Sequence, residues 1–149
     1  MLLDRSIFPP LLCKKLYIPS SRVLTLFTTA VDLVPAIPGK IIVPEKCFVI
    51  KELGTAYNIN GASTIFAWDG VTTWSTLTPA SFIDSVNITF ALIVRPIVAG
   101  TANVIVQVPT ILGRALTVSN TVANFTVGTG GLTFWITFRI FDIANLGWL

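Results

Sequence analysis

One segment near the end of the chain alternates its side chains so regularly that it constrains the fold of the whole molecule. Between 132 and 141, Leu, Phe, Ile, Phe and Ile take every second position, with Thr, Trp, Thr, Arg and Phe between them. Successive side chains of a β-strand point to opposite faces, so this period of two predicts a strand with one buried face. The same period recurs at 86–94 and at 102–108. These segments predict an all-β domain of antiparallel sheets.

Shorter apolar runs predict the remaining strands. Two runs at 41–43 and 47–50 are separated at Pro44, which predicts an edge position or a β-bulge. Further strands are expected at 31–34, 64–68, 115–119 and 121–127. A helical fragment is expected over about 22–28, behind an N-cap at Ser20-Ser21.

Turn residues separate these runs, at Pro38-Gly39, Asp69-Gly70, Leu112-Gly113 and 128–131 among others. About eight short strands with turns between them are typical of a jelly-roll-like antiparallel sandwich. We expect this sandwich to span residues 21–143.

The first 20 residues have a different character. Pro9, Pro10 and Pro19 oppose a helix or a central strand, yet the segment is rich in apolar side chains that disordered tails lack. We therefore expect an extended N-terminal arm at 1–20 that lies on another surface, with a neighbouring subunit favoured over its own domain. The side chains expected to bind a partner are Ile7, Phe8, Pro9, Leu11, Leu12 and Tyr17.

Residues 144–149 form a short apolar C-terminal tail that contains Trp148. Tryptophan is enriched at protein interfaces, although the tail could equally fold against its own sandwich. The residues predicted as a candidate oligomer interface are Trp135, Arg139, Phe141 and Trp148.

The low charge of the chain indicates that much of its surface is covered. Of 149 residues, 53% are hydrophobic and 11% are charged, whereas about 25% are charged in an ordinary domain. The longest uncharged stretch, 115–138, is interrupted by Thr, Ser, Asn and Gly, so we expect no membrane span. The start does not resemble a signal peptide. The net charge of +3 comes from scattered lysines and arginines, so we expect no nucleic-acid partner.

The sequence contains few residues that could catalyse a reaction. It has no histidine, so nucleophilic triads and imidazole metal sites are excluded, and no two of its seven acidic residues form an evident pair. We expect no enzyme, cofactor or metal. The segment 128–131 lacks the Lys-Ser/Thr of a phosphate loop and is interpreted as a flexible hairpin connection.

Two sets of residues leave alternatives open. Tyr57, Trp68, Trp74 and Trp135 could form a sugar-binding platform or fill a core or trimer seam. Cys13 and Cys47 are the only cysteines, and the sequence does not decide whether they form a disulfide bond.

Three stretches resemble small virion proteins of tailed phages. They are LFTTAVDLVPAIPGKIIVP at 26–44, GTAY at 54–57 and GLTFWITFRIFD at 131–142. The likeness covers about 21–143, and the 20-residue arm is additional. It implies a jelly-roll module in a phage particle, such as a trimeric decoration or cement protein on the capsid.

From these observations we expect a structural virion protein that assembles in the host cytoplasm, forms a homo-oligomer with a trimer favoured, and stabilises the shell by binding the major capsid protein or another virion protein. The alternative is a receptor-binding or glycan-binding tip, a fibre or a neck component of a phage tail. That alternative predicts exposed aromatic side chains such as Trp68 and Trp74.

Overall fold

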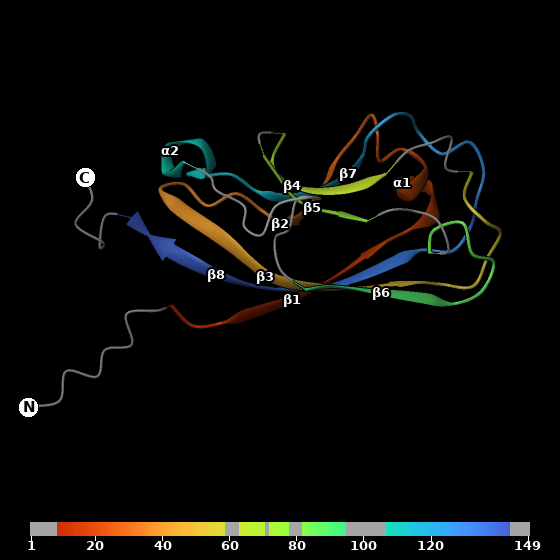
Figure 1. Ribbon diagram of the computed structural model, residues 1–149, viewed down its shortest axis with the longest axis horizontal. Helices are drawn as coiled ribbons and strands as arrows, with labels where there is room; N and C mark the ends of the chain where they lie inside the picture. The colour runs from red at the N-terminus through yellow and green to blue at the C-terminus, as the bar shows by residue number, and fades with distance from the viewer. Residues whose placement is uncertain (1–8, 59–62, 71, 78–81, 95–106, 144–149) are drawn as a thin grey trace, which may run out of the picture.

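The computed structural model describes residues 9–58, 63–70, 72–77, 82–94 and 107–143. These residues form two four-stranded antiparallel sheets packed as the two layers of a β-sandwich (Figure 1). The first sheet has the order β1-β8-β3-β6 and the second has the order β2-β7-β4-β5. The strands are β1 Leu12–Ile18, β2 Val31–Val34, β3 Lys40–Lys51, β4 Thr64–Trp68, β5 Thr72–Leu77, β6 Thr89–Val94, β7 Leu116–Asn120 and β8 Leu132–Asp142.

The core lies between the two sheets and is built from the inner side chains of each strand. In β8 the predicted alternation is confirmed, since Leu132, Phe134 and Ile136 are buried while the residues between them are half-buried. Phe134 meets Phe66 of β4 across the sandwich, with ring centroids 6.3 Å apart. Burying one such side chain stabilises the fold by about 1.5–3 kcal/mol, which fixes which face of β8 turns inward.

Strand β3 joins the two apolar runs that flank Pro44 into one strand. Its pairing with β8 shifts register between Pro44 and Lys46. Proline has no backbone N–H to donate, so the ladder cannot continue through it and one extra residue is accommodated. The predicted bulge is confirmed, and it leaves Glu45 exposed beside the outer side of the sheet.

The expected boundary of the N-terminal arm at residue 20 is wrong for its second half. Residues Leu12–Ile18 form β1, an edge strand of the first sheet that pairs with β8 along its whole length. The segment contains no proline, and an edge strand needs partners on one side only, so the prolines at 9, 10 and 19 delimit it without breaking it. Residues 1–8 lie outside the described part of the chain.

Several other expectations differ from the structure. Strand β6 begins at Thr89, three residues later than predicted, and 121–127 forms no strand. Helix α1 spans Ser20–Leu24, with Pro19 as its N-cap and no side-chain cap. Most of the predicted strand at 102–108 lies outside the described residues, and Val108 begins the short helix α2, Val108–Ile111. Strand β5, which is rich in threonine, was not predicted.

The glycine-rich segment 128–131 is tightly packed, and it ends the connection from β7 to β8, which lie in different sheets and form no hairpin. A Cβ atom on Gly128 would lie 2.3 Å from the ring of Tyr57, and one on Gly130 would lie 2.6 Å from the Glu52 carbonyl oxygen. The Tyr57 hydroxyl donates to the Gly130 carbonyl at 2.7 Å. The interpretation as a flexible hairpin was therefore wrong, because glycine serves here for close approach.

Candidate interaction surfaces

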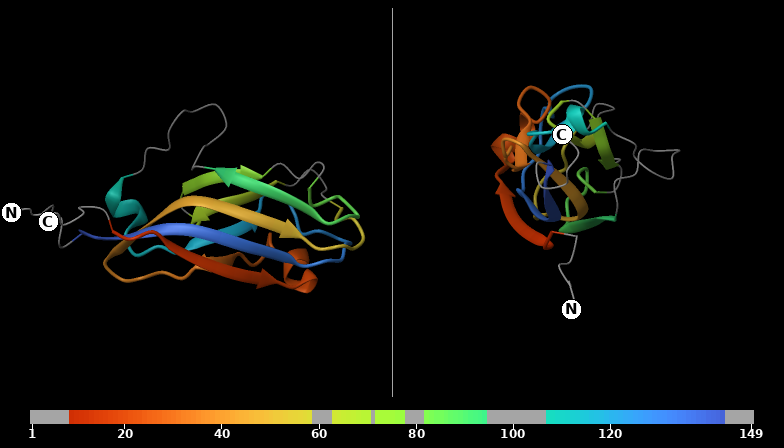
Figure 2. Two further views of the ribbon diagram at one scale, coloured as in Figure 1. Left: turned by 90° about the horizontal axis from the view of Figure 1, so that it is seen from below. Right: turned by 90° about the vertical axis from the view of Figure 1, so that its left-hand side faces the viewer.

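The outer face of the first sheet turns away from the core, and Figure 2 (left) views the sheet from that side. Residues directly opposite each other in an antiparallel ladder share a face. Lys15 of β1 and Phe48 of β3 both pair with Trp135 of β8, so these three side chains form one row across the sheet. Cys13 and Lys46 pair with Thr137 in the next row. Trp135 therefore lies at the centre of this outer face.

Trp135 is held by contacts from both neighbouring strands. The ammonium group of Lys15 lies 4.9 Å from the centroid of the Trp135 ring. On the other side the Phe48 ring lies 5.9 Å away in a tilted arrangement. Such a cation–π contact at an exposed site contributes about 0.5–1 kcal/mol. The indole is thus fixed as a flat, half-buried surface in the middle of the sheet.

Arg139 makes an ion pair and a hydrogen bond within its own chain. Its Nε donates to the Glu45 carboxylate at 2.9 Å, and its Nη1 donates to the Pro9 carbonyl at 2.5 Å. The bulge at Pro44 brings Glu45 within reach. Arg139 therefore holds the start of the described chain against β8, and its charge is balanced before any partner binds.

The other residues predicted for the arm and for the oligomer interface have different surroundings. Phe141 is half-buried and packs partly against the core. Leu11, Leu12 and Tyr17 are exposed by 50%, 36% and 50%, respectively. Tyr17 pairs with Thr133 and extends the outer face to the β1 edge, whereas Leu12 pairs with the buried Phe138 and lies on the inner side of that edge. Ile7, Phe8 and Trp148 lie outside the described residues.

A second apolar surface, which we call the loop end, lies at one end of the sandwich. The described parts of four connections lie there, α1–β2, β3–β4, β5–β6 and β7–β8, because alternate connections of an antiparallel chain return to the same end (Figure 1). Backbone bonds from Gly54 to Val86 and from Asn58 to Val127 tie the loops together. The exposed apolar residues of the loop end are Phe27, Leu53, Val86, Ile88, Val122 and Val127.

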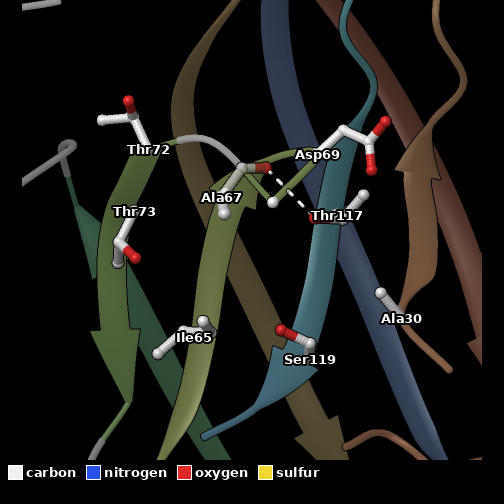
Figure 3. Close-up of a pocket in the computed structure, with 9 residues that line it drawn as sticks. Ala30, Ile65, Ala67, Asp69, Thr72, Thr73, Thr117 and Ser119 are labelled. Carbon is white, nitrogen blue, oxygen red and sulfur yellow. Dashed lines mark hydrogen bonds between the residues drawn. The ribbon is translucent and has the colours of Figure 1, made fainter. Parts of the chain in front are cut away.

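A shallow hollow of about 210 Å³ lies on the outer side of the second sheet. Figure 3 shows small side chains from β4, β5 and β7 that line it, among them Ala67, Thr73 and Ser119. The hydroxyl of Thr117 is turned to its own sheet and donates to the Ala67 carbonyl at 3.4 Å. Asp69 at the rim lies 4.0 Å from Arg114. Lined without an aromatic ring, the hollow has no stacking surface for a sugar.

The aromatic residues considered as a sugar platform belong mainly to the core. Trp68 and Trp74 are 3% and 0% exposed, and Tyr57 is 1% exposed. The Trp68 indole donates to the Ile42 carbonyl at 2.8 Å, and the Trp74 ring packs against Phe66 in a tilted arrangement. The expectation that Trp68 and Trp74 are exposed is wrong, because both point between the sheets. Trp135 alone of the four lies on an outer face.

The two cysteines are free and lie on opposite sides of the first sheet. Cys13 pairs with Thr137 on the outer face, whereas Cys47 pairs with Ile136, whose side chain is buried. Burial raises the pKa of the Cys47 thiol to about 12. Among the described residues, no group of His, Cys, Asp or Glu could hold a metal ion.

A buried polar cluster closes the sandwich beneath the glycine segment. Lys51 is fully buried, and its Nζ donates to the Glu52 carbonyl at 3.1 Å and lies 5.7 Å from the Tyr57 ring. Burial lowers the pKa of Lys51. Burial, with the charges of Tyr17 and Glu52, raises the pKa of Tyr57 to about 12. These contacts join β3 to the segment before β8 and give the cluster a structural role.

Comparison with protein-family models, with curated proteins and with solved structures finds no match to this chain. Neither helix in the described part of the chain has the length or the apolar character needed to cross a bilayer. The function is therefore inferred from the surfaces that the sandwich presents.

Proposed function

We propose that this chain is a structural protein of a virus particle, a jelly-roll module that binds an assembled shell and stabilises it, as a decoration or cement protein does. It acts as a homo-oligomer, with a trimer favoured, and performs no catalysis. Because such a protein binds only the assembled state, it shifts the assembly equilibrium towards intact particles by mass action.

The strand order supports the jelly-roll part of this proposal. In an eight-stranded jelly roll, the strands divide between two sheets, one with the order 1-8-3-6 and the other with the order 2-7-4-5. The two sheets of this chain have these orders. Jelly rolls occur in viral capsid domains, but also in lectins and cupins, so the fold alone does not assign the function.

The surfaces support the adhesive part. Apolar side chains lie outside the core in two separate places. The outer face of the first sheet carries the exposed Tyr17 with the half-buried Phe48 and Trp135, and the loop end carries six exposed apolar residues. Large exposed apolar surfaces on a protein with few charges mark interaction sites. The presence of apolar side chains outside the core is the observation on which the proposal depends.

The alternative of a glycan-binding tip loses its main support. It requires aromatic side chains exposed around a pocket, whereas Trp68 and Trp74 are buried. The hollow on the second sheet offers hydroxyl groups but no ring on which a sugar could stack.

Localisation in intact particles tests the proposed function. Labelled antibody against the chain is expected to decorate the shell of particles from the same source in a regular array. A truncation that removes only residues 1–8 keeps β1, so it tests the arm without removing a strand of the sheet. Label confined to a tail tip or fibre would favour the alternative, and label absent from the particles would refute a virion role.

A further inference from the structure

We propose that the outer face of the first sheet docks an acidic protein surface with an apolar centre, through a site formed by Lys15, Lys46, Phe48 and Trp135. This inference rests on the proposed function only for the source of that partner, which would be another virion protein. The sequence had suggested that Trp135 lies at an oligomer seam, and the charges around it point to a different occupant.

The site has a flat apolar centre with a lysine on each side. The rings of Trp135 and Phe48 are neighbours in a tilted arrangement, with centroids 5.9 Å apart. Lys15 lies on the β1 side, over the indole ring, and Lys46 lies in the adjacent row on the β3 side. Both lysines are exposed. Aromatic residues at the centre and charges at the rim are the arrangement of protein-binding hot spots.

Within the described part of the chain, no carboxylate balances the charge of either lysine. The ion pairs found among the described residues involve Lys40, Arg114 and Arg139, so neither Lys15 nor Lys46 has a carboxylate partner there. Glu45, the acidic residue next to this face, is already bound by Arg139. The face is therefore cationic, and complementary potentials favour an acidic partner.

A second copy of this chain is poorly suited to the same face. Two copies packed face to face would bring four unpaired lysines together, and like charges across an interface cost several kcal/mol. The chain also has few free carboxylates to offer from elsewhere. Among the described residues, the acidic side chains already engaged by a cation or by hydrogen bonds are Glu45, Glu52, Asp69 and Asp142.

The edge of the sheet is also protected against a further strand. Lys14 of β1 pairs with Ile136, whose side chain points into the core, so Lys14 lies on the inner side of an edge strand. Inward-pointing charges on edge strands are a common device against edge-to-edge pairing. Docking on the open face is therefore favoured over strand addition at β1.

Binding of labelled acidic polymers to the purified chain tests this inference. The main probe is a random copolymer of glutamate and tyrosine, and poly-glutamate and oligo-deoxythymidine are the comparisons, all followed by fluorescence anisotropy. The copolymer is expected to bind more tightly than poly-glutamate, because tyrosine adds an apolar contact to Trp135. Its affinity should fall as salt is raised.

Two charge reversals and one matched control separate a specific site from general attraction. Lys15→Glu and Lys46→Glu are each expected to weaken copolymer binding about tenfold or more. Arg22→Glu makes the same charge change on the exposed side of α1 and should weaken it less than about twofold. Trp135→Ala should remove the preference for the copolymer over poly-glutamate while poly-glutamate still binds, and circular dichroism verifies folding of each variant.

Three results would overturn the inference. Arg22→Glu could weaken binding as much as Lys46→Glu, which would mean that only net charge matters. Oligo-deoxythymidine could bind more tightly than the copolymer, which would indicate a nucleic-acid site. The chain could bind no acidic probe while Trp135→Ala abolishes its self-association, which would assign the face to a second copy. If particles lack the label but the copolymer results hold, the proposed function fails and acidic docking stands.

Discussion

At the scale of single residues, the least expected feature is a polar cluster inside a strongly apolar chain. Lys51 is fully buried, and it lies near the ring of Tyr57, whose hydroxyl donates to Gly130. Both pKa values move in the direction that keeps the groups neutral, because burial disfavours the charged form of each. Backbone carbonyl groups accept hydrogen bonds from Lys51 and Tyr57, so the cluster holds the glycine segment in place.

The ionisation of Tyr57 should govern the alkaline stability of the fold. The pKa of Tyr57 is raised from 10.0 to about 12 in the folded chain. The unfolded chain therefore loses the Tyr57 proton at a lower pH than the folded chain does. The contribution of Tyr57 to the free energy of unfolding is constant below pH 10 and is lost as the pH rises towards 12. The lowered pKa of Lys51 acts with the opposite sign, because the folded chain binds fewer protons and gains stability as pH rises towards 10.5.

Tyr57→Phe is expected to cost about 1 kcal/mol below pH 10 through the lost hydrogen bond, and to flatten the decline above pH 10. Chemical denaturation across this pH range measures both effects. Tyr17→Phe is the comparison: burial and the hydrogen bond to Glu52 also raise the pKa of Tyr17, but this side chain is half exposed, so the slope should change less. An unchanged slope above pH 10 in Tyr57→Phe would show that this tyrosine does not control the transition.

At the scale of elements, the connection between β7 and β8 shows how local sequence can mislead. A run of glycines suggests freedom, and the predicted strand at 121–127 suggests a hairpin. In the structure the connection is fixed by long-range contacts: Asn124 accepts from the Phe27 backbone at 3.1 Å, and Thr129 accepts from the Thr55 backbone at 2.8 Å. These partners lie far away in the sequence, so no local pattern could reveal them.

The packing of this connection predicts a strong effect of one added methyl group. Gly128→Ala places a Cβ 2.3 Å from the Tyr57 ring at a φ of +132°, so we expect it to destabilise the fold by about 2–4 kcal/mol. Gly39→Ala is the matched control, because Gly39 also has a positive φ but has nothing within 4 Å of an added Cβ. It should cost about 1–2 kcal/mol. Equal losses of melting temperature in the two variants would contradict the close packing at Gly128.

At the scale of the whole molecule, the exposed apolar side chains are divided between two surfaces of different character. The outer face of the first sheet combines aromatic rings with two lysines that pair with no described carboxylate, whereas the described residues of the loop-end connections include no lysine or arginine. Apolar residues can meet around a symmetry axis without bringing like charges together. We therefore propose that self-association involves the loop end and that contact with another protein involves the outer face.

Ile88→Lys should shift the chain from oligomer to monomer in sedimentation velocity, because Ile88 is 69% exposed at the loop end. A lysine at an apolar contact would be repeated in every copy, and like-charge repulsion together with desolvation weakens the contact by several kcal/mol. Gln107→Lys adds the same charge at an exposed position beside α2, at the opposite end of the sandwich, and serves as the control (Figure 1). If both variants keep the oligomer of the unchanged chain, the loop end is not its interface.

The sequence by itself determined the all-β class, the strands at 31–34 and 64–68, an edge position or bulge at Pro44 and the inner face of β8. Each of these depends on local chemistry: the period of two, the missing N–H of proline, or a turn such as Pro38-Gly39. The sequence also identified Trp135 and Tyr17 as surface candidates. It missed Lys15 and Phe48, whose only sequence signal is that they alternate with inward-facing neighbours.

Only the tertiary structure decided which strands are neighbours, and the outer face depends on that. Lys15, Phe48 and Trp135 come from three strands far apart in the chain, and the pairing of β1 and β3 with β8 makes them one site. Burial likewise separated Trp135 from Trp68 and Trp74, which look alike in the sequence. Register and burial are set by contacts between distant segments, so a pattern of adjacent residues cannot encode them directly.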